Sequence, residues 1–304
     1  MDIICPYCAS SYGRKKGIVN SSKLGKVQRC ECYSCSRQYS IPFNTPSKKH
    51  FPKILLFDIE TSLMKVYVWG LYKQYIPHDN IIDDWFIISW SAKWLYDDKV
   101  ISDVVTPKEA VKSNDKRILN SMWKLLDKAD IVIAHNGDRF DLRKLNWRFI
   151  NSDIKPPSPY RSIDTLKISR KEFAAPSHKL DFLTKNFNVQ TKIKTDFQLW
   201  VDCMNGNKKR LDEMLKYNKQ DVVALEDVYL ILRPYIKNHP NLGVLMDMDV
   251  CSTCGSKNIE ETESVYLTSA NKFLVFRCNS CKTPYIRTKK NINDYKTNYR
   301  SVSR

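Results

Sequence analysis

Two acidic residues, Asp58 and Glu60, stand at the end of an apolar run in the segment 53–61. The run 54–57 predicts a buried central strand that is apolar on both faces. Successive side chains of a strand point to opposite faces, so Asp58 and Glu60 share one side while Ile59 points into the core. Two neighbouring carboxylates repel each other unless a cation lies between them, and carboxylate oxygens suit Mg²⁺ or Mn²⁺. The alternative is a strand that ends in two solvated acids.

Eight of the ten cysteines form four Cys-x-x-Cys pairs, two near each end of the chain. Adding 246 to the N-terminal positions gives the C-terminal ones without a gap. Four thiolates from two such pairs suit one tetrahedral Zn²⁺, so a structural zinc ion is expected at each end; redox dithiols or chance pairs are the alternative. The expected ligands are Cys5, Cys8, Cys32 and Cys35, then Cys251, Cys254, Cys278 and Cys281. Cys30 is expected to be a strand residue without a metal role, and Cys203 a free, semi-buried thiol.

The formal net charge of +17 implies an anionic partner, for which nucleic acid is the usual candidate. Residues 1–50 carry nine Lys or Arg and two acids, and residues 282–304 carry seven and one, interleaved with tyrosines. A solvated, disordered tail is the alternative for the second segment. No apolar run approaches the ~18 residues of a membrane span, and no secretory signal is recognised. We therefore expect a cytoplasmic protein without a membrane partner, with reduced cysteines.

The segment between the cysteine pairs alternates β-rich and helical patterns. Strands are expected over 65–70, 85–96, 101–106 and 131–134, and helices over 116–129, from Arg139, over 179–187 and over 212–238, with a less regular run over 189–206. On the second strand, Phe86, Ile88, Trp90 and Trp94 share a face, which predicts core rather than a base-stacking surface. His178 is expected to be structural.

Further acids follow later in the chain. Asp141 would lie in the first turn of a helix that begins after the strand 131–134 and a glycine turn, and acids are also favoured there by the helix dipole alone. Tyr217 and Asp221 are four residues apart on a predicted helix and therefore share a face. Asp164 is expected to have a structural or N-cap role.

In order, the chain shows Phe57-Asp58-Ile59-Glu60-Thr61, then His135-Asn136-Gly137 with Phe140-Asp141, then Tyr217-x-x-x-Asp221. This series resembles the three motifs of the DEDD 3′→5′ exonucleases, the superfamily of polymerase proofreading domains and ribonuclease D. The resemblance covers roughly residues 53–238. Lys216 stands where the histidine-type subgroup has His, and Tyr217 matches the tyrosine-type subgroup.

The resemblance implies an α/β, ribonuclease H-like fold, a mixed sheet flanked by helices, with two Mg²⁺ or Mn²⁺ ions bound by the acids. Asp58 would bridge both ions, Glu60 and Asp221 would complete the site of the ion that activates water, and Asp141 would hold the second ion through water. Tyr217 would orient the attacking water. The substrate contacts that it implies are Thr61, Asn136 and Phe140.

The expected organisation is an N-terminal zinc ribbon (1–41), a linker (42–52), an exonuclease domain (53–240), a C-terminal zinc ribbon (247–290) and a basic tail (291–304). The function implied is metal-dependent 3′→5′ exonuclease activity, with ribbons that aid nucleic-acid binding. DNA is preferred over RNA because the ribbons resemble those of DNA-processing proteins, and the small, Lys- and Asn-rich build resembles a phage protein. The alternatives are an exoribonuclease, a non-catalytic nucleic-acid-binding adaptor, and a proofreading subunit that binds a polymerase.

Overall fold

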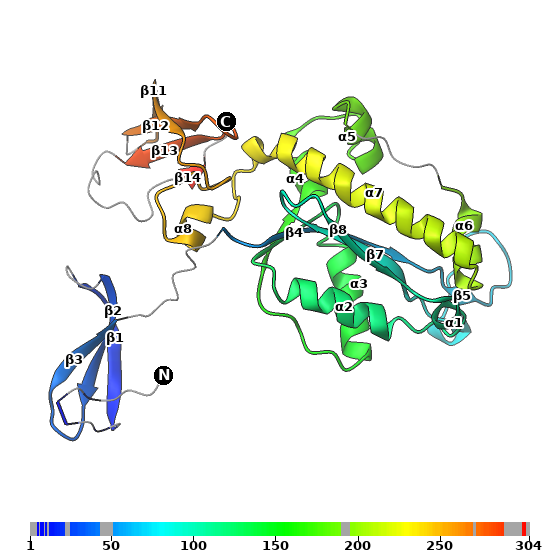
Figure 1. Cartoon of the computed structure of the whole chain (residues 1–304), viewed down its shortest axis with the longest axis horizontal. Coiled ribbons are helices and arrows are strands. Elements are labelled where there is room, and N and C mark those ends of the chain that lie inside the picture. Colours follow the sequence, from blue (N-terminus) through cyan, green and yellow to red (C-terminus); the bar gives the residue numbers. More distant parts are fainter. Residues whose placement is uncertain are drawn as a thin grey trace. The chain divides into compact units, whose positions relative to one another are not determined.

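The computed structural model describes residues 5, 7–8, 10, 12–21, 25–42, 51–189, 195–269, 272–288 and 300–301. The chain divides into two compact units, Met1–Lys49 and His50–Arg304 (Figure 1). Most of the expected linker (43–50) and of the expected basic tail lies outside the described residues. The boundaries given above for the individual modules remain predictions.

The larger unit is built on a mixed sheet of five strands in the order β10-β9-β4-β7-β8. The strands are β4 (Ile54–Thr61), β7 (Ile87–Trp94), β8 (Val100–Val104), β9 (Ile131–Ala134) and β10 (Arg161–Asp164). β9 runs parallel to β4 and to β10, while β7 is antiparallel to both β4 and β8. The expected mixed α/β sheet is confirmed, with β4 as its central strand.

β4 is buried on both faces, and its side chains alternate between two parts of the core. Leu55, Phe57 and Ile59 belong to one hydrophobic cluster, whereas Ile54 and Leu56 belong to another. Period-2 alternation therefore divides the strand as its sequence predicts. The inward position of Ile59, which is 2% exposed, is confirmed.

Helices cover both faces of the sheet; α7 lies along one face, and α2 and α3 lie on the other (Figure 1). The helices are α1 (Pro107–Val111), α2 (Lys116–Leu126), α3 (Asp141–Asn151), α4 (Thr165–Glu172), α5 (Leu180–Asn186), α6 (Phe197–Met204), α7 (Lys208–Leu232) and α8 (Leu242–Met246), with 3₁₀ turns η1 (His78–Asn80) and η2 (Arg233–Tyr235). The described part of the run 189–206 is more regular than expected, because it contains α6, which Asp196 caps by accepting the N–H of Leu199. Cys203 on α6 is fully buried rather than semi-buried.

The strand expected over 65–70 is wrong as a strand of the main sheet. Only β5 (Lys65–Val66) is extended there, and it pairs with β6 (Ile81–Asp83) in a separate two-stranded sheet. The segment does not pair with β4, because β7 and β9 occupy both sides of that strand. Residues 63–84, which we call the aromatic arm, therefore form most of the β4–β7 connection, and their own two-stranded sheet leaves many of their apolar side chains exposed.

A small antiparallel sheet accompanies the cysteine pairs at each end of the chain. The N-terminal one contains β1 (Gly13–Ser21), β2 (Gly25–Cys32) and β3 (Gln38–Pro42). The C-terminal one contains β11 (Ile259–Leu267), β12 (Lys272–Cys278), β13 (Pro284–Thr288) and β14 (Arg300–Ser301). Both modules bring four cysteines together, as the repeated spacing predicts.

The segment that joins the main sheet to the C-terminal module is anchored by His239. Its Nδ1 donates to the carbonyl of Pro240 at 2.8 Å, so its Nε2 accepts from the Tyr229 hydroxyl, also at 2.8 Å. Leu242 and Met246 of α8 then pack into the same cluster as Leu56. Burial lowers the pKa of His239 to about 4 and keeps the imidazole neutral.

Stability should fall as pH falls from about 6.5 to about 4, because the unfolded chain binds the His239 proton more tightly than the folded chain does. The contribution lost is on the order of 3 kcal/mol. Urea denaturation at pH 7.5 and pH 4.5 measures it, and His239→Phe should show a smaller pH dependence than the wild type. An equal loss in both proteins would contradict this role for His239.

Candidate active site

Three carboxylates converge at the edge of the sheet where the central strand β4 ends. Oxygen atoms of Asp58, Glu60 and Asp221 all lie within 4.8 Å of one another. Asp58 and Glu60 come from the end of β4, and Asp221 comes from the middle of α7. A register shift between β4 and β7 falls directly after Glu60, and such bulges redirect side chains at sheet ends. The sequence expectation that Asp58 and Glu60 share a side is confirmed.

Asp141 binds the backbone of the same strand. β9 pairs with β4 only as far as Leu56, so the backbone beyond that point has no strand neighbour on this side. The Asp141 carboxylate fills the place by accepting the N–H of Ile59 at 3.1 Å. Burial raises the pKa of Asp141 to about 7, although that hydrogen bond opposes the shift. Asp141 is not part of the three-acid group, and its role toward a second ion remains a prediction.

The turn between β9 and α3 is held in an uncommon backbone conformation. Asn136 has φ +69°, a left-handed value that Asn tolerates better than most residues. At Gly137 a Cβ atom would lie 2.5 Å from that of Ala134, so glycine is required there. The Asp164 carboxylate accepts the N–H groups of Asn136 and Leu166, at 2.9 and 3.0 Å, and thus braces the turn and caps α4. The expected structural role of Asp164 is confirmed.

Tyr217 lies on α7 one turn before Asp221, with its ring edge-on to Trp200. Burial raises the pKa of Tyr217, and the charges of Asp221, Glu60 and Asp58 raise it further. The phenol therefore keeps its proton and can act as a hydrogen-bond donor at the acid cluster. That donor is what a water-orienting tyrosine needs.

Asn218 is a residue of this site that the sequence did not reveal. It is fully buried on α7, and its Nδ2 donates to Asp58 Oδ2 at 2.6 Å. It follows Tyr217 and precedes Asp221 by three residues, which places it on the same helical face as Asp221. Only that spacing could have drawn attention to it, because an asparagine within a helix is usually a surface residue.

Replacing Asn218 by leucine should preserve volume but leave the Asp58 carboxylate without this donor. Partners of this kind orient metal ligands, and their loss typically costs ~10–100-fold in metal affinity or activity. The measurement is the Mn²⁺ concentration that gives half-maximal hydrolysis of a nucleic acid, which should rise in Asn218→Leu. Asn120→Leu, on the exposed face of α2, is the matched control and should behave like the wild type. Equal metal dependence in both variants would exclude this orienting role.

The group of three carboxylates fits a divalent metal ion. Three carboxylates at one point match Mg²⁺ or Mn²⁺, which prefer oxygen ligands.

Thr61 ends β4, and Asn136 and Phe140 lie in the turn after β9, so all three are placed at the sheet edge that holds the acids. Their contacts with a substrate remain predictions.

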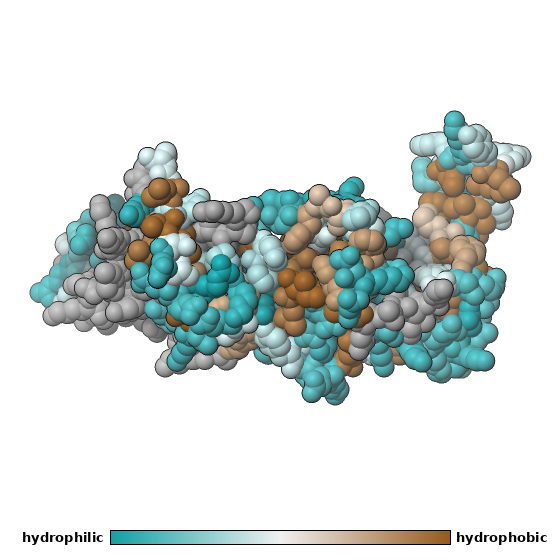
Figure 2. Space-filling view, turned by 90° about the horizontal axis from the view of Figure 1, so that it is seen from above, coloured by the Kyte–Doolittle hydropathy of each residue, from teal (hydrophilic) through white to brown (hydrophobic). Residues whose placement is uncertain are grey.

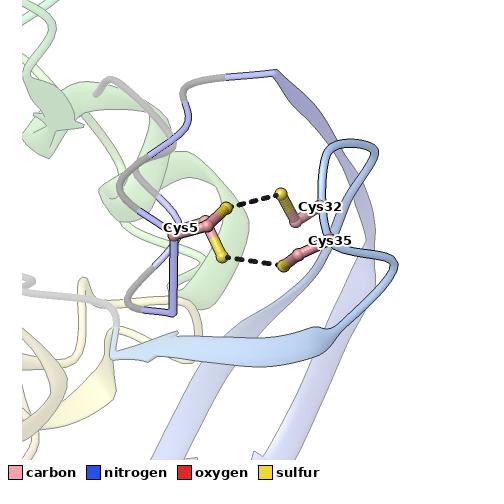
Figure 3. A group of neighbouring side chains, drawn as sticks. Cys5, Cys32 and Cys35 are labelled. Carbon is pink, nitrogen blue, oxygen red and sulfur yellow. Dashed lines mark hydrogen bonds between the residues drawn. The ribbon is translucent and has the colours of Figure 1, made fainter.

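In each four-cysteine cluster the thiols face one another across the two pairs. The Cys5–Cys35 and Cys8–Cys32 sulfur atoms are 3.6 Å apart. Figure 3 shows Cys5, Cys32 and Cys35 of this cluster. The equivalent pairs of the C-terminal cluster, Cys251–Cys281 and Cys254–Cys278, show the same separation. Zn–S bonds of ~2.3 Å in a tetrahedron place sulfurs ~3.8 Å apart, whereas disulfide sulfurs are ~2.05 Å apart. The clusters therefore fit zinc.

The two clusters also correspond in their supporting hydrogen bonds. Ser10 Oγ lies 2.7 Å from Ser34 Oγ, and at positions higher by 246 Ser256 Oγ lies 2.8 Å from Ser280 Oγ. Cys30 is buried on β2 outside the four-thiol group, as expected. The two modules thus share one architecture at the level of individual contacts.

Among the remaining expectations, His178 is structural, since its Nδ1 lies 2.8 Å from Ser169 Oγ. Phe86, Ile88 and Trp90 are core residues, and Trp94 packs against them. Within the part of the chain that the structure describes, no helix combines the length and apolar character needed to cross a bilayer.

A comparison with protein families places this site in a known group. The model of the RNase H superfamily matches residues 55–233, which extend from β4 to η2 and include all the acids discussed. The chain belongs to the RNase H superfamily. Both cysteine modules lie outside the part matched to this superfamily.

The chain is also similar to part of one curated protein. It is the DNA polymerase III PolC-type of Ureaplasma parvum serovar 3, 24% identical over 201 residues. The match covers 60% of this chain but 12% of the polymerase. The similarity therefore concerns one segment of a much longer protein.

Proposed function

We propose that this RNase H superfamily protein is a metal-dependent nuclease that removes nucleotides from the 3′ end of nucleic acid, with DNA as the preferred substrate. The observation that carries the proposal is the convergence of Asp58, Glu60 and Asp221 within 4.8 Å, from two elements far apart in sequence. Clustered carboxylates are unfavourable without a counter-charge, which divalent cations supply.

The residues that would hold the ions are Asp58, Glu60 and Asp221, with Asp141 acting through water. Bound Mg²⁺ or Mn²⁺ would activate water and stabilise the charge that develops on the phosphate. Hydrolysis breaks the bond between phosphorus and the 3′ oxygen, which takes a proton, and releases a 5′-monophosphate.

The protein's own groups have separate tasks in this scheme. Tyr217 keeps its proton and donates a hydrogen bond that orients the attacking water. Asn218 fixes the rotamer of Asp58 through the 2.6 Å hydrogen bond. Asp141 holds the backbone of Ile59, which keeps Asp58 and Glu60 in register.

The remaining features support a nucleic-acid substrate. The net charge of +17 favours a polyanion, and the two cysteine clusters would hold structural zinc in modules that aid binding. Similarity to part of a DNA polymerase favours DNA over RNA. A non-catalytic adaptor is disfavoured, since all four acids and Tyr217 are present.

The test is an incubation of the purified protein with DNA and RNA strands labelled at either end, in Mg²⁺, Mn²⁺ or EDTA. Shortening from the 3′ end that requires the divalent ion is expected, faster on DNA. Absence of shortening would refute nuclease activity, and shortening from the 5′ end would refute the proposed polarity.

A further inference from the structure

A lysine near the start of α3 is flanked by two aromatic rings. The Lys144 ammonium is 3.6 Å from the ring centre of Trp85 and 5.0 Å from that of Phe140. Lys144 follows Asp141 by one turn of α3, and Trp85 directly follows the aromatic arm. In the part of the chain that the structure describes, this ammonium makes no ion pair. This cation, one helical turn after Asp141, is thus available to an anion from solution.

An ion pair between α3 and the residue before α2 holds the backbone next to Trp85. Arg148 forms a two-pronged ion pair with Asp115, at 2.6 and 2.8 Å, and Asp115 also accepts the N–H of Ile87 at 2.9 Å. This buried link joins α3 to the start of β7, just after Trp85. Trp85 lies two residues before β7 and Phe140 directly before α3, so this link holds together the segments that carry the two rings, and the arm ends just before Trp85.

The aromatic arm exposes rings that a folded domain normally buries. Trp69 is 100% exposed, Tyr75 90% and Tyr72 78%. The arm begins three residues after Glu60 and is the light-blue loop beyond β5 in Figure 1. In Figure 2, hydrophobic residues gather on a projection at the same side of the molecule.

We propose that Lys144 and the rings of Phe140, Trp85 and the aromatic arm form a track for single-stranded nucleic acid, which leads away from the acid cluster. Lys144 contacts a backbone phosphate, and Trp69, Tyr72 and Tyr75 stack on bases upstream of the terminal nucleotide. The inference rests on the proposed function, because it assumes that a 3′ end lies at the acids.

Three observations favour a nucleic-acid strand over a protein as the occupant. Phe140 directly precedes Asp141, Lys144 follows it by one turn of α3, and the arm begins three residues after Glu60, so both segments leave elements that carry the acids. The exposed face of α3 and the turn before it add Arg139, Arg143 and Trp147, which interleaves charge and rings. Every base has a π-face, so exposed Trp and Tyr bind strands of any sequence.

The experiment measures binding of a fluorescein-labelled 12-nucleotide single strand, in Ca²⁺, with strand integrity checked on a gel. Alanine at Trp69, Tyr72 or Tyr75 should weaken binding by about tenfold for each stacked ring. Lys144→Gln should lower the slope of log Kd against log salt by about 0.7, the value for one single-strand phosphate contact, and Lys144→Arg should restore it.

Two control variants distinguish this track from a general effect of charge and from an apolar protein-binding surface. Lys124→Gln removes an equal charge at the end of α2 that precedes β9, on the opposite edge of the sheet, and should leave the salt slope unchanged. Leu71→Ala, on the arm but without a ring, should bind as the wild type does. A loss with Leu71→Ala as large as with Trp69→Ala would overturn stacking and favour an apolar protein partner.

Hydrolysis by the wild-type protein is measured separately in Mn²⁺. If the wild type shortens the strand while the arm and Lys144 variants bind it normally, the track is refuted and the nuclease stands. If the wild type shortens nothing, the proposed function itself fails.

Discussion

Replacing Asp58 by asparagine is expected to lower the rate of nucleic-acid hydrolysis by about 10⁴-fold or more. Metal ions contribute several kcal/mol to stabilising transition-state charge, and each 1.36 kcal/mol is tenfold in rate. Asp58 is the acid that Asn218 orients, and the resemblance assigns it to both ions. The asparagine keeps an oxygen that accepts from Asn218 Nδ2, so the change removes charge with little change in shape.

The melting temperature of Asp58→Asn distinguishes the loss of a metal ligand from misfolding, because a misfolded protein would melt at a lower temperature. Removing one of three clustered carboxylates relieves repulsion, so the melting temperature in EDTA should stay equal or rise in Asp58→Asn. Asp98→Ala, in the exposed β7–β8 turn at the opposite edge of the sheet, is the matched control and should keep full activity. An Asp58→Asn protein that hydrolyses DNA at the wild-type rate would refute the proposed active site.

Removal of zinc should destabilise the N-terminal unit more than the larger unit. Among its described residues, the buried cluster consists of Cys5, Cys30, Cys32 and Tyr39, with Cys35 packed against it. So small a core cannot offset the entropy of folding, so a bound zinc ion would supply the folding energy, ~10–16 kcal/mol for small zinc domains. Cys32→Ala should therefore reduce zinc from about two ions per chain to about one and unfold this unit.

Cys30 provides a control on the same strand. Cys30 and Cys32 are both buried on β2, but only Cys32 belongs to the four-thiol group. Cys30→Ala removes the same atom type and should keep about two zinc ions per chain. Metal analysis by mass spectrometry, with limited proteolysis of residues 1–49, distinguishes the variants. Equal zinc content in both would refute the assignment of Cys32 as a ligand.

Several features of the site could be predicted from the sequence because they depend on the local periodicity of strands and helices. Alternation along a strand decides that Asp58 and Glu60 share a side, and helical spacing decides that Tyr217 and Asp221 do. The repeated cysteine spacing likewise separates Cys32 from Cys30, since tetrahedral coordination needs matched pairs.

The sequence could not show contacts that depend on the path of the whole chain. The region 65–70 has the composition of a strand, but only Lys65–Val66 pair, with β6, and β7 and β9 occupy both sides of β4. An asparagine within a helix is usually exposed, and only the crossing of α7 over β4 brings Asn218 to Asp58.

The sequence by itself therefore predicted the ribonuclease H-like fold, the acids that converge and the two four-cysteine clusters, because residue type and spacing specify the chemistry of ligand atoms. The tertiary structure alone decided how that chemistry is held and approached. Asp141 holds the Ile59 backbone where β9 ends, Lys144 lies between two rings, and the arm extends beyond the sheet. Each of these depends on which elements become neighbours, and long-range packing rather than local periodicity sets that.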